Sequence, residues 1–282
     1  MRITITGASG LIGTKLATTL RERGDEVTTL SLRRDGARPD ALAGRDAVVH
    51  LAGEPVAQRW SDDAKRRILE SREQGTRELV QAMTTADPPP QALISASAVG
   101  YYGPRGDERV TEDTPPGTGF LADVCRRWEH EANQAPAGRV VTVRTGVVLD
   151  RDGGALSKML LPFKLGAGGP VAGGRQYMPW IHADDVVGIY LAAIDGDWRG
   201  PVNATAPEPV TNATFSKALG RALRRPAIAP IPGAALRVLY GDMAEIVTTG
   251  QRVVPQRTLE LGYRFTYEDL DQALRGALAS KA

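Results

Sequence analysis

Near its N-terminus the chain reads Thr6-Gly7-Ala8-Ser9-Gly10-Leu11-Ile12-Gly13. This stretch follows a β-branched run, Ile3–Thr6, and opens an apolar helical pattern that extends to Arg23. Glycines with this spacing allow a tight turn, close approach of the backbone to a pyrophosphate, and close packing of helix on strand. The helix start adds free N–H groups and a partial positive charge. A turn that merely needs positive φ would not require all three glycines, so we expect a dinucleotide site made by Gly7, Ser9, Gly10, Leu11, Ile12 and Gly13.

The first half of the chain alternates short β-branched runs with longer helical patterns. Such runs predict strands that are buried on both faces. The expected strands are Ile3–Thr6, Val27–Leu32, Ala47–Leu51, Leu93–Ala96 and Val140–Thr145, and the expected helices are Leu11–Arg23, Ser61–Met83 and Gly119–Asn133. This alternation predicts an α/β fold with a doubly wound parallel sheet of Rossmann type, in which helices cover both faces.

After about Asp150 the pattern becomes irregular, because glycine pairs and prolines interrupt it. Short helices are expected at Asp184–Ile194, Asn212–Arg224 and Tyr267–Leu278. We therefore expect a dinucleotide-binding Rossmann domain over residues 1–150, completed by segments of 180–205. Residues 151–282 are expected to form a smaller C-terminal substrate lobe with an extension.

The composition is that of an ordinary globular protein, with 42% hydrophobic and 24% charged residues, which excludes disorder and coiled coil. Lys and Arg number 35 against 33 Asp and Glu, and the basic residues are scattered, so nucleic acid is not an expected partner. The single cysteine, Cys125, excludes an internal disulfide and fits a reducing compartment. The N-terminus leaves no room for a signal peptide, and the uncharged stretch 186–194 is too short to span a bilayer. We expect a cytoplasmic protein with no membrane partner.

The second strand indicates which dinucleotide is bound. NAD sites usually carry an acidic residue about 20 residues beyond the glycines, where it binds the ribose 2′-hydroxyl. At that distance from Gly13 this chain has Arg33, followed by Arg34. A guanidinium suits a 2′-phosphate, so the sequence favours NADP over NAD. The alternative interpretation is that both arginines belong to a solvated turn.

Further motifs resemble those of the extended short-chain dehydrogenase/reductases, and among these the atypical NAD(P)-binding "epimerase family", which is similar to nucleoside-diphosphate-sugar epimerases. The motifs follow the third and fourth strands and recur in the second half, at Asp46–Gly53, Ser95–Gly103, Pro179–Val186 and Gly250–Pro255. The resemblance implies that Leu51, Ala52 and Gly53 approach the cofactor ribose. From its chemistry alone, His50 is explained equally well as a buried histidine with hydrogen-bond partners and as a functional residue.

The family's catalytic pair is absent. The resemblance implies a Tyr-x-x-x-Lys pair that relays a proton and a serine that contacts the substrate or nicotinamide. Ser97 matches the serine, whereas Leu121 and Cys125 stand where Tyr and Lys are expected. The nearest phenols are Tyr101 and Tyr102, which either replace the relay or only pack as a wall. The candidate catalytic residues are therefore Ser97, Tyr101 and Tyr102.

Arg144, Arg175 and Tyr177 are candidates for binding an anionic substrate at the carboxyl edge of the sheet. Arg72, on the long helix, is a further candidate: it either directs a cation into the cleft or forms a surface salt bridge. The sequence spacing of His182, Asp184 and Asp185 resembles that of metal ligands. A helix N-cap followed by an acidic first turn explains these three residues better. We expect no metal.

Two functions remain open. One is an NADP(H)-dependent oxidoreductase or epimerase-like enzyme with an altered relay, acting on a small, anionic or nucleotide-linked molecule. The other is a catalytically silent NADP-binding sensor or interaction module. The sequence does not determine the oligomeric state; a homodimer is compatible with the resemblance, because dimers are common among the resembled proteins.

Overall fold

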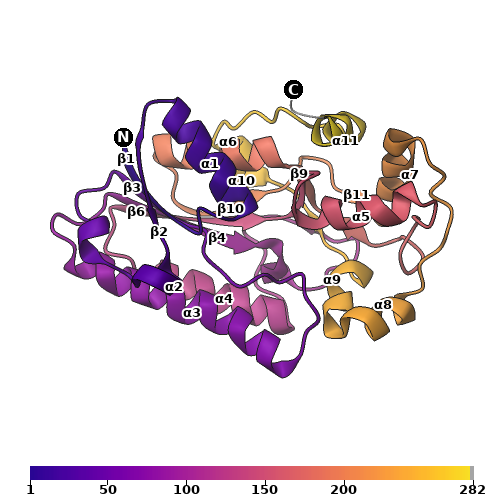
Figure 1. Ribbon diagram of the computed structural model, residues 1–282, viewed down its shortest axis with the longest axis horizontal. Coiled ribbons are helices and arrows are strands. Elements are labelled where there is room, and N and C mark those ends of the chain that lie inside the picture. Colours follow the sequence, from indigo (N-terminus) through magenta and orange to yellow (C-terminus); the bar gives the residue numbers. More distant parts are fainter. Residues whose placement is uncertain (280–282) are drawn as a thin grey trace.

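The computed structural model describes residues 1–279, whose centre is a six-stranded sheet (Figure 1). The strands follow the order β10 (Gly200–Ala204), β6 (Arg139–Thr145), β4 (Ala92–Ala98), β3 (Ala47–His50), β1 (Arg2–Thr6) and β2 (Glu26–Leu30). Every pairing in this sheet is parallel. The predicted α/β fold with a doubly wound parallel sheet is confirmed.

Helices cover both faces of the sheet (Figure 1). On one face lie α1 (Leu11–Glu22) and α6 (Ala183–Asp195), and on the other α3 (Asp62–Thr85) and α4 (Phe120–Ala132). Successive strand residues point to opposite faces: Val49 packs in the α1–α6 core, and Val48 in the α3 core. Both side chains are fully buried, and each such burial contributes about 1.5–3 kcal/mol.

Most predicted boundaries agree with the structure within two residues, and the differences have local causes. Strand β2 ends at Leu30, not Leu32, because the chain turns into the short helix α2 (Leu32–Asp35). The carboxylate of Asp35 accepts the Ser31 N–H at 3.1 Å, which closes that turn. Helix α3 begins as the sequence predicts, since the Ser61 hydroxyl accepts the Ala64 N–H at 3.2 Å. Strand β4 runs on to Ala98 because it pairs with β6 over its whole length.

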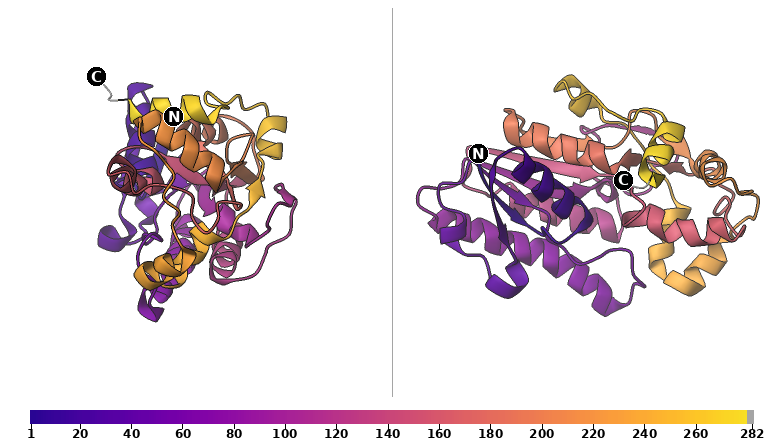
Figure 2. Two further views of the ribbon diagram at one scale, coloured as in Figure 1. Left: turned by 90° about the vertical axis from the view of Figure 1, so that its right-hand side faces the viewer. Right: turned by 45° about the horizontal axis from the view of Figure 1, so that its top comes forward.

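The remaining elements are short, and most lie at one end of the molecule (Figure 2). Two-stranded pairs join β5 (Arg109–Val110) to β12 (Arg252–Val253), β7 (Val147–Leu149) to β9 (Trp180–His182), and β8 (Tyr177–Met178) to β11 (Val210–Thr211). The other helices are α5 (Gly154–Lys164), α7 (Asn212–Leu223), α8 (Gly233–Tyr240), α9 (Glu245–Thr248), α10 (Gln256–Glu260) and α11 (Leu270–Leu278), with 3-10 turns at Pro39–Ala41, Val99–Tyr102 and Asp242–Ala244. None of the helices within residues 1–279 has the length and apolar character needed to cross a membrane.

The start of α6 attaches the C-terminal chain to the sheet. His182 caps this helix, since its Nδ1 accepts the Asp184 N–H at 3.1 Å. Asp185 is fully buried, and its carboxylate accepts the backbone N–H groups of Thr266 and Tyr267 at 2.7 and 3.0 Å. The sequence indicated only a helix start here, whereas the structure shows an anchor for the residues that precede α11.

Two glycines hold helix α1 against the turn that precedes it. Gly7 has φ +73°, which side chains rarely adopt, and a Cβ on Gly13 would overlap the Gly7 carbonyl oxygen and lie 2.8 Å from Ala8 Cα. A Cβ on Gly10 would meet only the Gly7 carbonyl oxygen, at 3.4 Å. Gly13 therefore serves the close packing of helix and turn, while Gly10 lies beside open space.

This difference predicts unequal effects of the two alanine substitutions. Gly13→Ala should reduce the free energy of unfolding by on the order of 2–3 kcal/mol, because rigid backbone atoms must move. Gly10→Ala should cost under about 1 kcal/mol, as expected at an extended helix N-cap. Urea unfolding of both variants measures this. Equal losses would show that Gly13 is not closely packed.

Candidate functional site

The order of the strands places a crevice at the carboxyl end of β1. Strand β2 lies on one side of β1, and β3, β4, β6 and β10 lie on the other, so the direction of the strand order reverses between β1 and β3. Ligands of open α/β sheets bind at such a switch point. A Cβ on Gly7 would lie 2.6 Å from the Ala52 nitrogen and from the Leu51 carbonyl carbon. The turn after β1 and the loop after β3 therefore meet at this crevice.

The N-terminus of α1 faces the same crevice without a side-chain cap. Its N-cap is Gly10, and no side chain accepts a hydrogen bond from its first turn. Ser9 and Gly10 are exposed, and Leu11 and Ile12 are half-buried. Uncapped N–H groups with a partial positive charge can bind a phosphate group.

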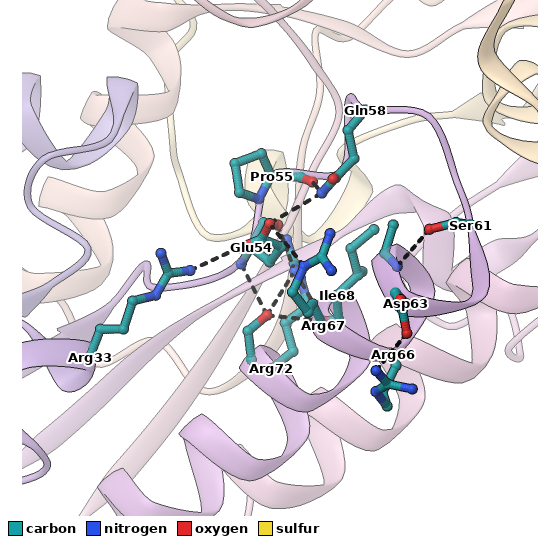
Figure 3. Close-up of polar contacts among 12 residues, drawn as sticks. Arg33, Glu54, Pro55, Gln58, Ser61, Asp63, Arg66, Arg67, Ile68 and Arg72 are labelled. Carbon is teal, nitrogen blue, oxygen red and sulfur yellow. Dashed lines mark hydrogen bonds and ion pairs between the residues drawn. The ribbon is translucent and has the colours of Figure 1, made fainter.

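Arg33 reaches across to the loop after β3 (Figure 3). Its Nη2 lies 2.8 Å from Glu54 Oε2, although 79% of the Arg33 side chain is exposed. Arg67 Nε and Gln58 Nε2 approach the other carboxylate oxygen of Glu54, at 3.8 and 3.3 Å. Burial alone would raise the pKa of Glu54, but these hydrogen bonds and charges lower it. Arg34 is exposed and forms no ion pair within residues 1–279.

Glu54 was missed by the sequence reasoning. The signal that could have found it is its place directly after Gly53, where the loop after β3 turns toward the cofactor crevice. In this structure the acidic side chain of Glu54 pairs with Arg33.

A cavity of about 360 Å³ lies between the carboxyl ends of β4 and β6, helix α4, and the segment around α9. Ser97, Leu121 and Cys125 contribute to its wall, together with Arg72 from α3 and Tyr177 from β8. The segment 245–251 of the C-terminal lobe covers it. The family's serine position and the two positions of the missing pair thus line the same partly open cavity.

Ser97 is tied to a buried ion pair behind the cavity wall. Its hydroxyl donates to Glu129 Oε1 at 2.6 Å. Both oxygens of Glu129 accept hydrogen bonds from Arg144, at 2.8 Å each, in a bidentate pair. Because the Ser97 hydroxyl donates its single proton to Glu129, it can only accept a hydrogen bond from a ligand in the cavity.

The two phenols occupy different places. The Tyr102 hydroxyl is buried, donates to Asn203 Oδ1 at 2.7 Å and accepts from Arg144 Nη1 at 2.9 Å, and burial raises its pKa to about 12 despite these contacts. The ring of Tyr101 lies 3.5 Å from the Arg144 guanidinium carbon. Neither phenol is part of the cavity wall in the described chain.

The four predicted substrate-binding residues are not gathered at one point. Arg72 and Tyr177 line the cavity. Arg144 is buried, with its nitrogens donating to Glu129, Tyr102 and the Glu112 carbonyl oxygen, so it is held inside the protein. Arg175 is exposed and is not part of the cavity wall in the part of the chain described.

Cys125 is a neutral thiol. Burial raises its pKa to about 12, the charge of Glu129 adds to this, and the charge of Arg72 opposes it. Leu121 lies one turn earlier on α4 and has no ionisable group. Neither side chain is suited to exchange a proton near neutral pH.

His50 is a satisfied core residue. It is fully buried, and its Nδ1 and Nε2 form hydrogen bonds with the hydroxyls of Thr6 and Thr76, at 2.7 and 2.9 Å. Burial, and then the charge of Arg72, lower its pKa from 6.5 to about 4. In residues 1–279 no three His, Cys, Asp or Glu side chains gather as a metal site would require.

His50 should make stability sensitive to acid. The pKa of His50 is lower in the folded than in the unfolded protein, so the folded state favours the neutral ring. The resulting contribution to the free energy of unfolding is present above pH 6.5 and is lost as the pH falls toward 4, by about 3 kcal/mol in all. Between pH 7 and 5 the wild type should lose about 2 kcal/mol more than His50→Asn, measured by urea unfolding at both pH values. The same pH dependence in both proteins would contradict this assignment.

Comparison with known proteins identifies the family. The chain matches the NAD dependent epimerase/dehydratase family over residues 3–204, and a domain of unknown function (DUF1731) over residues 231–277. It is 40% identical to the epimerase family protein SDR39U1 of Mus musculus over 293 residues, which cover 99% of this chain and 100% of that protein.

Solved structures agree with this match. The human epimerase family protein SDR39U1 (isoform 2) with NADPH superposes with a TM-score of 0.91 at 37% identity, covering 98% of this chain and 99% of the human one. A nucleoside-diphosphate sugar epimerase of Corynebacterium glutamicum gives 0.80 at 35% identity, covering 99% of this chain and 58% of that one.

The sheet order and the glycine turn together define a Rossmann-type dinucleotide-binding protein. The chain belongs to the NAD dependent epimerase/dehydratase family, as an atypical extended short-chain dehydrogenase/reductase with a DUF1731 domain at its C-terminus. The resemblance inferred from its motifs is confirmed.

Proposed function

We propose that this protein is an NADP(H)-dependent oxidoreductase or epimerase-like enzyme that acts on a small molecule held in the cavity. The observation that carries the proposal is that Ser97, from the end of β4, faces a partly open cavity to whose wall the segment 245–251 also contributes. A protein that only senses a dinucleotide needs no second ligand-sized cavity beside it. The structure of the human relative was solved with NADPH, which supports the choice of NADP(H) over NAD(H) for this protein.

The residues at the crevice fit a dinucleotide. A Cβ on Gly10 would project into space that only the Gly7 carbonyl oxygen borders, and the first turn of α1 has no side-chain cap. The backbone N–H groups of residues 9–13 would bind the diphosphate, and Leu51, Ala52 and Gly53 would adjoin a ribose. Arg33 would bind the 2′-phosphate.

The cofactor supplies or accepts a hydride, and the residues of the cavity orient the substrate. Ser97 would accept a hydrogen bond from the substrate hydroxyl that undergoes reaction, and the Glu129–Arg144 pair fixes the Ser97 hydroxyl in that orientation. When that hydroxyl is oxidised, its proton would pass to Ser97 as Ser97 passes its own proton to Glu129, and the reverse transfer would accompany reduction. This arrangement suits a substrate hydroxyl better than a carbonyl oxygen, because a carbonyl cannot donate to Ser97. Tyr101 and Tyr102 would act indirectly, by positioning Arg144.

A catalytically silent NADP-binding protein is the second candidate. The observation that favours it is the chemistry of positions 121 and 125, where the cavity wall holds a leucine and a neutral thiol. Both functions require the same cofactor site, but only the enzyme should convert a substrate.

The cofactor site is tested by Gly10→Asp. The added carboxylate would occupy the place of the diphosphate and repel it, while the fold should survive because Gly10 borders open space. Fluorescence titration should show NADPH affinity at least 100-fold weaker, and thermal melting should show a folded chain, with Gly10→Ala as the matched control. Undiminished NADPH affinity would refute the site.

The wild type loaded with NADP⁺ or NADPH can then be offered a panel of alcohols, ketones and nucleotide sugars, with absorbance at the nicotinamide band as the readout. Turnover per folded molecule that Ser97→Ala reduces, compared at a temperature where both proteins are folded because the variant loses a buried hydrogen bond to Glu129, would support the enzyme. Tight NADPH binding without any turnover would favour the silent protein.

The preference for NADP is tested at Arg33, which reaches toward the crevice. Arg33→Ala should lower the ratio of NADP to NAD affinity tenfold or more, whereas Arg34→Ala should change it less than threefold. Glu54→Gln should raise the ratio, because the amide no longer pairs with Arg33 or repels a phosphate. Calorimetric titration measures all three ratios. An unchanged ratio in Arg33→Ala would assign the 2′-phosphate to another residue.

A further inference from the structure

The cavity has an uneven distribution of charge. Among its wall residues in the described chain, only Arg72 and Glu245 are charged, and Glu245 is exposed to solvent. Apolar side chains form much of the remaining wall: Val56, Trp60, Phe120, Leu121, Val124 and Ile246. A ligand inside would therefore meet an apolar surface and one largely buried cation.

Arg72 has no acidic partner. Its Nη1 donates to the backbone oxygens of Glu54 and Ile68 at 3.0 and 3.2 Å, and in residues 1–279 no carboxylate forms an ion pair with it. Its Nε and Nη2 have no hydrogen-bond partner among the described residues. Burial lowers the pKa of Arg72, which the weaker effects of Cys125 and Glu54 oppose.

The carboxylate that could neutralise Arg72 is engaged elsewhere. Glu54 directs its oxygens to Arg33, Arg67 and Gln58, and only its backbone oxygen contacts Arg72 (Figure 3). The guanidinium lies against Gly53, where an added Cβ would come within 3.1 Å of it, and its central carbon lies 5.0 Å from the Trp128 ring. Arg72 is therefore confined at the cavity wall with free donors.

A cation that is largely removed from water and has no counter-charge is unfavourable, and a bound anion reduces that cost; Arg72 is partly buried in this way. The anionic groups of the cofactor have other partners in the function proposed above: the glycine turn for the diphosphate and Arg33 for the 2′-phosphate. The donors of Arg72 remain for the second ligand. A planar guanidinium with adjacent free N–H groups suits a carboxylate, which can accept two hydrogen bonds.

We propose that the substrate is an amphipathic monocarboxylate, whose carboxylate binds Arg72 and whose aliphatic or aromatic body fills the apolar part of the cavity. This inference rests on the proposed function and names the substrate class of the same cavity. It places the carboxylate on α3 and leaves Ser97, on β4, for the oxygen that reacts.

The same chemistry disfavours a nucleoside-diphosphate sugar. Such a molecule carries two phosphate charges and many hydroxyls, whereas the wall offers one partly buried cation, and its apolar side chains outnumber its polar ones. Buried polar groups without partners lose their hydrogen bonds to water. The volume of about 360 Å³ is also at the lower end of ligand pockets.

The test is a calorimetric titration of the full chain, with and without saturating NADPH, using octanoate, octanamide and UDP-glucose as probes. Octanoate and octanamide have the same body and differ in head-group charge. The wild type should bind octanoate at least tenfold more tightly than octanamide, and more tightly than UDP-glucose.

Arg72→Met keeps the length of the side chain and removes its charge. It should weaken octanoate binding tenfold or more, leave octanamide binding within threefold, and leave NADPH affinity unchanged. Arg72→Lys should recover most of the octanoate affinity. Arg66→Met, on an exposed part of the same helix, is the matched control and should change nothing.

Three results would overturn the proposal: octanoate no tighter than octanamide, UDP-glucose tighter than octanoate, or an Arg72→Met variant that loses NADPH affinity instead. The last would assign Arg72 to the cofactor. If Arg72→Met does not fold, the comparison of probes on the wild type and on Arg72→Lys still decides. Failure of the wild type to bind NADPH would refute the proposed function, while the titrations without cofactor would still report on Arg72.

Discussion

The buried ion pair between Arg144 on β6 and Glu129 on α4 is the interaction on which the site depends. Burying two charges is favourable only when every remaining donor and acceptor has a partner, and losing one partner typically costs about 3–5 kcal/mol. Here the Glu129 carboxylate accepts hydrogen bonds from the Ser97 hydroxyl and from Arg144. The Nη1 of Arg144 donates to the Tyr102 hydroxyl and to the Glu112 carbonyl oxygen. The pair thereby sets the position of the strand end that carries Ser97.

The same network reaches the C-terminal part of the chain. Glu112 accepts the backbone N–H groups of Asn203 and Arg257, at 2.9 and 3.1 Å, and the Asn203 side chain donates to the Val254 carbonyl oxygen. At the start of α6, Asp185 holds the backbone of Thr266 and Tyr267. Two buried carboxylates therefore attach the chain after β10 to the nucleotide-binding half, and this attachment keeps the segment 245–251 over the cavity.

A cavity is present although its wall carries no Tyr-x-x-x-Lys pair at positions 121 and 125. At positions 121 and 125 helix α4 presents a leucine and a neutral thiol. A positive charge comes instead from Arg72 on α3, which lies over the Trp128 ring of α4. A cation from α3 can orient an anionic ligand. Within residues 1–279, however, no hydrogen bond joins it to Tyr177, the phenol of the cavity wall, so the two side chains do not form the linked pair that a proton relay requires.

Local sequence determined the elements and the nucleotide turn. The glycine spacing, the β-branched runs and the caps at Ser61 and His182 act over a few residues, so they could be interpreted without a structure. The partners of the arginine side chains could not be predicted from the local sequence. Arg72 and Arg144 were both candidates for binding an anion, yet Arg144 is neutralised by Glu129, whereas Arg72 pairs with no carboxylate within residues 1–279.

The reason is physical. A helix or turn depends on neighbours within one or two turns of the chain, whereas the state of a buried charge depends on whichever groups the folded chain brings within a few ångströms. Arg33 and Glu54 are 21 residues apart, and Arg144 and Tyr102 are 42 apart. The sequence by itself determined a Rossmann fold with a dinucleotide turn. Only the tertiary structure decided which cation is neutralised and which faces the cavity.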